Sequence, residues 1–266
     1  MLDMDGVLWR ESQPIGDLPG IFAHIARHGW QVVFATNNSS RTVTQYVEQL
    51  RTFGVQIEDW QVVTSAIAAA HYLASLYPQG GPVYIIGETG LIEALQSQGF
   101  YQVEDTSKPQ SQVLAVIAGI DRQINYAKLR QATLLIRSGA PFIATNSDRT
   151  FPTPEGLVPG AGAILAALEA ATYQQPQVMG KPAPLMYQIA LERLGTLASQ
   201  TLVVGDRPET DIAGAQAIGC PTALVLSGVT PPDQASHWQP APDLIAADLT
   251  AVVEQLIASH VTQPDI

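Results

Sequence analysis

Short runs of apolar residues, most of them β-branched, recur along the chain and are separated by stretches with helical spacing. The runs occupy residues 32–35, 83–86, 113–117, 142–144, 202–204 and 223–226. Continuous apolar runs of this length are typical of strands that are buried on both faces, as in parallel sheets. The hydrophobic pattern therefore predicts parallel strands at these places.

Amphipathic stretches lie between the apolar runs. Those at 43–53, 184–195 and 209–219 space their apolar residues for one helical face, and each ends at or next to a glycine, as helices commonly do. Strand and helix thus alternate along the chain. This alternation predicts an α/β fold built on a doubly wound, Rossmann-like parallel sheet.

Acidic and small polar residues follow several of the predicted strands. Residues 3–6 read Asp-Met-Asp-Gly, residues 36–39 read Thr-Asn-Asn-Ser, and residues 205–207 read Gly-Asp-Arg. In doubly wound sheets the ligand lies beyond the carboxyl ends of the strands. We therefore expect the chemistry of this protein at these three places.

Two segments rich in proline, glycine and glutamine divide the chain, at 78–82 and 173–177. The 266 residues correspond to about 1.8 domains at roughly 150 residues each. The two dividing segments predict that residues 78–175 form an inserted domain. Residues 1–77 and 176–266 then form the core domain together.

The charge balance excludes several classes of partner. The 13 basic and 24 acidic residues give a net charge of −11, and such a chain repels nucleic acid and anionic lipid. Charged residues make up only 14% of the chain, yet the longest apolar stretch, 113–120, is far shorter than the roughly 20 residues that cross a bilayer. We expect no nucleic-acid partner and no membrane span.

Cysteine usage and the start of the chain bear on the cellular compartment. Cys220 is the only cysteine, and no basic segment followed by an apolar one precedes Asp3, so we expect a cytoplasmic protein. Only Met1 and Leu2 precede Asp3, whereas a strand normally has about five residues. We therefore expect the native start to lie upstream.

Asp3 and Asp5 are the first candidates for chemistry. Alternation along a strand places both carboxylates on one side, where they repel each other unless a cation lies between them. A hard divalent cation such as Mg²⁺ prefers these oxygen ligands. Taken alone, Asp-x-Asp-Gly is also compatible with a solvated turn.

Three further signals occur later in the chain. The segment 36–39 ends a strand before a helix, where hydroxyl and backbone N–H groups either hold a phosphate or only begin a helix. Lys181 precedes a predicted helix and offers a cation to a phosphate. Asp206 follows a strand, and Asp211 lies in the next helical turn, so both side chains are expected at the same edge of the sheet.

The order of these motifs resembles the haloacid dehalogenase superfamily of phosphatases. The resemblance extends over essentially the whole chain. Its segments 3–10, 36–40, 144–148 and 180–182 look like the branch that contains 4-nitrophenylphosphatase, phosphoglycolate phosphatase and pyridoxal phosphate phosphatase. The resemblance implies a core domain with an inserted α/β cap, which matches the predicted middle domain.

The resemblance also implies a role for each aspartate. Asp3 would be the nucleophile that forms an aspartyl-phosphate, and Asp5 would be the general acid and base. Mg²⁺ would be held by Asp3, the Asp5 backbone carbonyl and Asp206, with Asp211 acting through bound water or by orienting the loop. Four further residues would hold the phosphoryl oxygens: Thr36, Asn37, Asn38 and Lys181.

Residues 145–156 look like the family's substrate-specificity loop. We expect four residues there to face the substrate: Asn146, Asp148, Arg149 and Phe151. Phe151 stands roughly where pyridoxal phosphate phosphatases have a histidine, and this departure argues against that substrate. Relatives often pair through their caps, so a homodimer is expected.

The leading hypothesis is a Mg²⁺-dependent phosphatase of a small phosphorylated metabolite, such as 2-phosphoglycolate, a sugar or glycerol phosphate, or an aryl phosphate. One alternative is a phosphotransferase that uses the same intermediate. Another is a phospho-accepting or phosphate-binding regulatory module. The module is disfavoured by the length of the chain, by the order of its motifs and by the presence of both Asp3 and Asp5.

Overall fold

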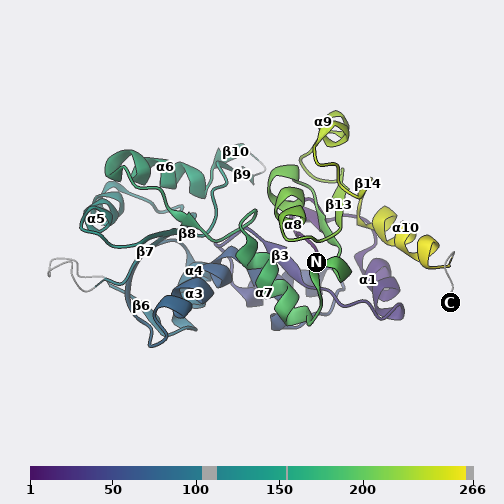
Figure 1. Cartoon of the computed structure of the whole chain (residues 1–266), viewed down its shortest axis with the longest axis horizontal. Coiled ribbons are helices and arrows are strands. Elements are labelled where there is room, and N and C mark those ends of the chain that lie inside the picture. Colours follow the sequence, from purple (N-terminus) through teal and green to yellow (C-terminus); the bar gives the residue numbers. More distant parts are fainter. Residues whose placement is uncertain (104–112, 154, 262–266) are drawn as a thin grey trace. The chain divides into compact units, whose positions relative to one another are not determined.

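The computed structural model describes residues 1–103, 113–153 and 155–261. The chain forms two compact units (Figure 1). Unit 1 contains Met1–Ala35, Tyr46–Val63 and Tyr187–Ile266, and unit 2 contains Thr36–Gln45 and Thr64–Met186. The cap boundaries expected at 78 and 175 stay a prediction.

The sheet of unit 1 is arranged around Leu2. Leu2 forms parallel bridges to Phe34 and to Val204, so it lies between two strands, β3 and β12. On one side β3 (Phe34–Thr36) pairs with β4 (Val62–Thr64), and on the other β12 (Val203–Gly205) is followed by β13 (Thr222–Val225) and β14 (Leu244–Ala246). The strand order reverses at Leu2, which makes Leu2 the switch point where doubly wound sheets bind ligands.

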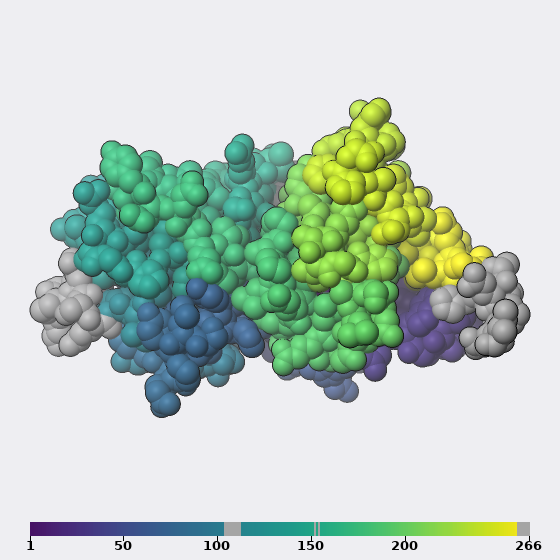
Figure 2. All heavy atoms as spheres, in the orientation of Figure 1, coloured from purple at the N-terminus to yellow at the C-terminus, as the bar shows by residue number. Residues whose placement is uncertain are grey.

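The other elements of unit 1 are short. Its helices begin and end as follows: α1 Leu18–Arg27, α2 Val43–Thr52, α7 Pro184–Leu194, α8 Ala213–Ala217, α9 Pro232–His237 and α10 Leu249–Val261. The hairpin of β1 (Trp9–Arg10) and β2 (Gln13–Pro14) follows the first aspartates. Figure 2 shows the α9 segment, in yellow-green, as a projection on this unit.

Unit 2 contains a five-stranded parallel sheet. Its order is β11 (Gln177–Val178), β8 (Phe142–Ala144), β7 (Val116–Ala118), β5 (Gly81–Ile86) and β6 (Phe100–Gln102). An antiparallel hairpin, β9 (Thr150–Thr153) and β10 (Gly156–Pro159), follows β8. The carboxyl ends of β5, β7 and β8 therefore lie at one edge.

Helices cover both faces of this sheet. Alternate strand residues, among them Tyr84, Val116 and Phe142, pack against α5 (Tyr126–Arg137) and α6 (Ala161–Thr172) in one apolar core. In Figure 1, α3 (Ser65–Leu76) and α4 (Thr89–Gln96) lie on the other side. Burial on both faces explains why the strands read as continuous apolar runs.

The predicted α/β class with parallel sheets is confirmed, and the predicted strands are present with small shifts of their ends. The helix predicted at 209–219 is wrong in its first turn, since a π-helical turn, Pro208–Ile212, precedes α8. The hydroxyl of Tyr187 donates to the carbonyls of Thr210, at 2.6 Å, and of Asp211, at 3.2 Å. These carbonyls are thereby drawn from a regular helical ladder.

Among residues 1–103, 113–153 and 155–261, every helix is too short or too polar to span a bilayer.

Candidate active site

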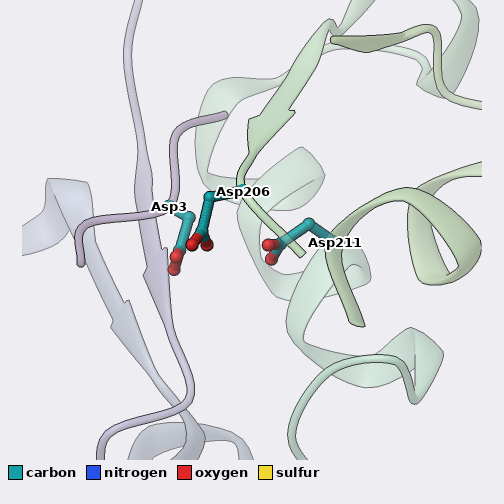
Figure 3. A group of neighbouring side chains, drawn as sticks. All are labelled: Asp3, Asp206 and Asp211. Carbon is teal, nitrogen blue, oxygen red and sulfur yellow. The ribbon is translucent and has the colours of Figure 1, made fainter. Parts of the chain in front are cut away.

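Three aspartates gather at the carboxyl edge of the sheet in unit 1. Asp3, Asp206 and Asp211 each offer a carboxylate oxygen, and these oxygens lie within 4.8 Å of one another. Figure 3 shows the three carboxylates pointing toward a common region. Asp206 and Asp211 are buried and Asp3 is half-buried, so the cluster concentrates negative charge where little water reaches it.

The backbone of unit 1 explains this convergence. Asp3 follows the switch residue Leu2, and its N–H donates to the Val204 carbonyl at 2.9 Å. Asp206 directly follows β12. Asp211 lies in the π-helical turn, where its Oδ2 accepts from the Arg207 N–H at 3.0 Å.

A loop after β13 holds Asp206 in place. The Val229 N–H donates to Asp206 Oδ2 at 2.8 Å, and the Thr230 hydroxyl donates to the Asp206 carbonyl at 2.6 Å. A Cβ added at Gly228 would lie 1.9 Å from Asp206 Oδ2, and one at Gly6 would lie 2.5 Å from it. Only glycines fit at these two positions.

Sequence reasoning missed this loop, although a signal was present. Residues 227–230 directly follow the predicted strand 223–226. The rule that found Asp206, that ligands lie beyond strand ends, also applies there.

The donor set fits a hard divalent cation. Carboxylate oxygens are the ligands that such cations prefer, and the oxygens around one octahedral Mg²⁺ are about 3 to 4 Å apart. Three carboxylates at this spacing repel one another unless a cation offsets their charge. The cluster is consistent with a divalent metal site, and which of the three carboxylates bind the ion stays a prediction.

Asp5 lies in the turn that follows Asp3. Its carboxylate is exposed, and its Oδ1 accepts from the indole N–H of Trp9 at 2.8 Å. Its carboxylate is not one of the three clustered groups. The metal contact implied for Asp5 runs through its backbone carbonyl and stays a prediction.

The other predicted residues belong to unit 2, where Asn37 is the centre of a buried polar network. Its Oδ1 accepts from the Lys181 N–H at 2.7 Å, and its Nδ2 donates to the Lys181 carbonyl at 3.0 Å. The Asn37 carbonyl accepts from Asn146 Nδ2 at 2.8 Å and from the Ser65 hydroxyl at 2.5 Å. This carboxamide therefore fixes the backbone of Lys181, whose side chain is buried.

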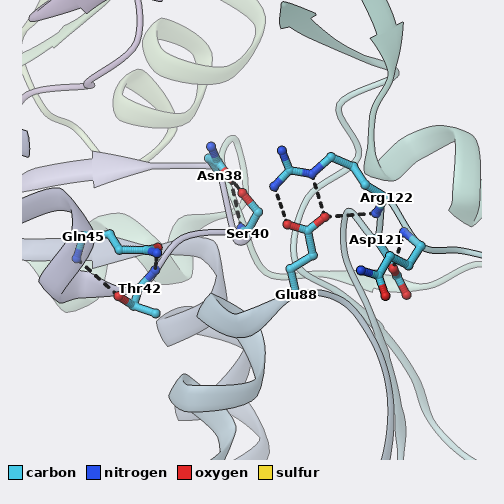
Figure 4. Close-up of polar contacts among 8 residues, drawn as sticks. Asn38, Ser40, Thr42, Gln45, Glu88, Asp121 and Arg122 are labelled. Carbon is cyan, nitrogen blue, oxygen red and sulfur yellow. Dashed lines mark hydrogen bonds and ion pairs between the residues drawn. The ribbon is translucent and has the colours of Figure 1, made fainter. Parts of the chain in front are cut away.

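Thr36 and Asn38 form two successive turns at the end of β3. The Thr36 hydroxyl accepts from the Asn38 N–H at 3.2 Å. The Asn38 Oδ1 accepts from the Ser40 N–H at 3.0 Å and from its hydroxyl at 2.7 Å (Figure 4). Thr36 is buried and Asn38 is half-buried.

The four residues predicted to face the substrate follow β8. Asn146 is buried, and its Oδ1 accepts from the Asp148 N–H at 3.1 Å. Arg149 is exposed, and Phe151 is half-buried in β9 opposite Val158. Their facing the substrate stays a prediction.

Ion pairs occupy the same edge of this sheet. Arg122 donates from Nε to Glu88 Oε1 at 2.8 Å (Figure 4), and this bond holds the pKa of Glu88 below its usual value. Lys128 pairs with the buried Asp121 at 2.6 Å. Each of these acids is thus neutralised by a basic side chain.

The order of the strands and the position of the carboxylates define a class of protein, the doubly wound α/β proteins with an acidic site at the switch point. A family model described as "Haloacid dehalogenase-like hydrolase" matches residues 1–101. A second model, for HAD-hydrolase-like proteins, matches residues 178–252. The first match contains the predicted catalytic residues Asp3 and Asp5, and the second contains Asp206 and Asp211, which were predicted for the metal site.

Individual relatives agree with the family models. The chain is 39% identical to phosphoglycolate phosphatase 2 of Arabidopsis thaliana over 86% of this chain and 83% of the relative. It is 34% identical to an acid sugar phosphatase of Staphylococcus aureus over 96% of each chain. Among solved structures, the chain is similar to a glycerol phosphate phosphatase from Mycobacterium tuberculosis in complex with magnesium. The two are 35% identical and superpose with a TM-score of 0.87, over 95% of this chain and 75% of the other.

The chain belongs to the haloacid dehalogenase-like hydrolases. It is a phosphoric monoester hydrolase, a phosphatase of small phosphorylated metabolites. The resemblance inferred from the motifs is confirmed.

Proposed function

We propose that this phosphatase is Mg²⁺-dependent and works through an aspartyl-phosphate on Asp3. The observation that carries the proposal is the cluster of Asp3, Asp206 and Asp211 at the switch point, with a further carboxylate, Asp5, two residues after the nucleophile. Binding alone needs no acid beside a nucleophile, whereas two-step hydrolysis needs one.

In the first step, a carboxylate oxygen of Asp3 attacks phosphorus while the bond from phosphorus to the leaving oxygen breaks. Asp5 starts this step as the neutral acid and gives its proton to the leaving oxygen. The products are the aspartyl-phosphate, the free alcohol and the Asp5 carboxylate, so protons and charge balance.

In the second step, water attacks phosphorus and Asp5 takes one of its protons. The bond from phosphorus to Asp3 breaks, which releases hydrogen phosphate and restores the Asp3 carboxylate. Asp5 is again the neutral acid. One side chain thus serves as acid and then as base.

Mg²⁺ would be held by the Asp3 carboxylate, the Asp5 backbone carbonyl and Asp206, with Asp211 acting through bound water or by orienting the loop. When bound, it supplies positive charge to phosphoryl oxygens that bring negative charge into a cluster of acids. The cluster fits this ion by donor chemistry and spacing.

Thr36, Asn37, Asn38 and Lys181 would hold the phosphoryl oxygens. Chain connectivity supports a shared task with Asp3. The Ala35 N–H donates to the Leu2 carbonyl at 2.8 Å, and the residues that follow these two are Thr36 and Asp3. We propose that the Asn37 carboxamide serves this site by fixing Lys181.

The relatives' names support a small substrate, such as 2-phosphoglycolate, a sugar phosphate or glycerol phosphate. We propose that the cap selects the leaving group through Asn146, Asp148, Arg149 and Phe151. A homodimer through the cap and a cytoplasmic location also stay predictions.

The test is a screen of phosphorylated metabolites with Mg²⁺ and with EDTA, using wild type and Asp3→Asn. We expect Mg²⁺-dependent release of free phosphate by wild type and a loss of at least about 10³-fold in Asp3→Asn. Asp233→Asn, an exposed residue of α9, is the matched control and should retain full activity. Phosphorylated acceptor in place of free phosphate would indicate a phosphotransferase, and near wild-type turnover by Asp3→Asn would show that the nucleophile is assigned wrongly.

A further inference from the structure

Trp9 makes a bond that the two-step mechanism above does not use. Its indole N–H donates to Asp5 Oδ1 at 2.8 Å. Trp9 is only 1% exposed, whereas the Asp5 side chain is exposed. A buried donor therefore holds an exposed carboxylate.

The turn between the two residues sets their distance. The Met4 carbonyl accepts from the Leu8 N–H at 2.8 Å, and the Gly6 N–H donates to the Trp9 carbonyl at 2.8 Å. Gly6 has a φ of +82°, which glycine adopts without strain. This closed turn returns the chain so that Trp9 lies beside Asp5.

Aromatic packing fixes the donor itself. The Trp9 ring stacks on Tyr46 with centroids 6.5 Å apart and contacts Phe53 with centroids 6.0 Å apart. A ring packed in this way has little rotational freedom. Its N–H direction is therefore constant.

The chemistry of the indole suits a residue that changes protonation state. An indole N–H only donates, so Oδ1 of Asp5 remains an acceptor both in the carboxylate and in the neutral acid. The same bond persists when Asp5 gives its proton to the leaving oxygen and when it takes a proton from water.

We propose that Trp9 is a positioning residue that orients the Asp5 carboxylate. The proposal rests on the proposed function, because it needs Asp5 to protonate the leaving group. Without the Trp9 donor, Asp5 loses one of its hydrogen bonds, and its carboxylate spends less time in line with the leaving oxygen. Loss of the Trp9 donor should therefore slow the first step most for leaving groups that require a proton.

The test compares an alkyl phosphate, glycerol phosphate, with 4-nitrophenyl phosphate in Trp9→Phe. Phenylalanine keeps an aromatic ring and removes the donor, and 4-nitrophenolate leaves without full protonation. We expect kcat/KM, which reports on transfer to Asp3, to fall about tenfold for the alkyl phosphate and less than about threefold for the aryl phosphate. The affinity for inorganic phosphate as inhibitor should not change.

Trp60→Phe is the matched control. Trp60 also donates its indole N–H to a carboxylate, Glu58 Oε2, at 3.1 Å, and it lies away from the aspartates in sequence and is 41% exposed. Trp60→Phe should leave kcat/KM unchanged for both the alkyl and the aryl phosphate. If Trp9→Phe unfolds, a tryptophan analogue with sulfur in place of the indole N–H tests the same bond with the ring preserved.

Equal losses for the two substrates, or no loss for either, would overturn the positioning role of Trp9. Asp5→Asn separates this failure from failure of the proposed function. If Asp5→Asn shows the selective loss for alkyl phosphate and the Trp9 variants do not, only the inference about Trp9 is wrong. If Asp5→Asn itself retains both rates, the proposed acid is wrong, and the inference falls with it.

Discussion

Replacing Gly6 by alanine tests whether the packing around Asp206 sets the metal site. Gly6 has a φ of +82°, and a Cβ there would lie 2.5 Å from Asp206 Oδ2, 2.7 Å from its Cγ and 2.9 Å from the Gly228 Cα. The backbone of Gly228 is not free to yield as a flexible side chain is. The carboxylate of Asp206 must therefore move.

Gly219 provides a matched comparison. Its φ is +81°, and a Cβ added there would meet nothing within 4 Å. Both substitutions incur the strain of a left-handed backbone, about 1 to 2 kcal/mol. Any larger effect of Gly6→Ala comes from the contact with Asp206.

The additional loss of unfolding free energy can be calculated from the hydrogen bond that Asp206 loses. Asp206 Oδ2, the atom that the new Cβ would strike, accepts from the Val229 N–H at 2.8 Å. A hydrogen bond to a charged group contributes about 1.5 to 3 kcal/mol. We expect Gly6→Ala to lose about 2.5 to 5 kcal/mol of unfolding free energy, against about 1 to 2 kcal/mol for Gly219→Ala.

The assay combines urea unfolding with titration of Mg²⁺ against phosphatase activity. At a urea concentration and temperature where both variants are folded, Gly6→Ala should need about 10- to 100-fold more Mg²⁺ for half-maximal rate. Gly219→Ala should match wild type. If the two variants show the same Mg²⁺ dependence, the glycine does not act through Asp206 and the reasoning is refuted.

Two further predictions concern unit 2. Asn37→Asp keeps the acceptor for the Lys181 N–H but places an oxygen against the Lys181 carbonyl, so KM and the inhibition constant of inorganic phosphate should rise about tenfold. The control, Asn125→Asp, preserves a helix cap and should change neither constant. An equal response of the two variants would contradict the role of Asn37. Glu88→Gln should lower stability by at most about 1 kcal/mol at pH 7. Because Arg122 lowers the folded pKa of Glu88, this stabilisation is lost as pH falls through that pKa. The difference in thermal unfolding should therefore shrink as the pH is lowered below the ordinary pKa of a glutamate. A difference that does not change with pH would contradict the ion pair.

The strands were predictable because each is buried on both faces. Residues 142–144 were predicted as a strand and form β8 without any shift, since a short, continuous apolar run is typical of a strand buried on both faces. The short strand β11 and the hairpin of β9 and β10 were not predicted. Their residues are partly exposed, so no hydrophobic pattern marks them.

The sequence predicted the acidic residues of the candidate site. It did not predict the residues that hold these acids in position. Asp206 was found because an acid follows a strand. Gly228 and Val229 hold that acid from 22 and 23 positions away, a contact that only the folded sheet creates. The bond from Trp9 to Asp5 depends likewise on a tight turn whose geometry no periodicity encodes.

The carboxylates of the two units accept hydrogen bonds from different kinds of donor, and this difference distinguishes structural from functional carboxylates. In unit 2, Glu88 is neutralised by a basic side chain, Arg122. In unit 1, Asp206 and Asp211 accept bonds from the backbone N–H groups of Val229 and Arg207. A backbone amide carries no net charge, so these bonds fix the carboxylates without neutralising them. The hydrogen bonds thereby hold the carboxylates in an arrangement suited to a divalent cation.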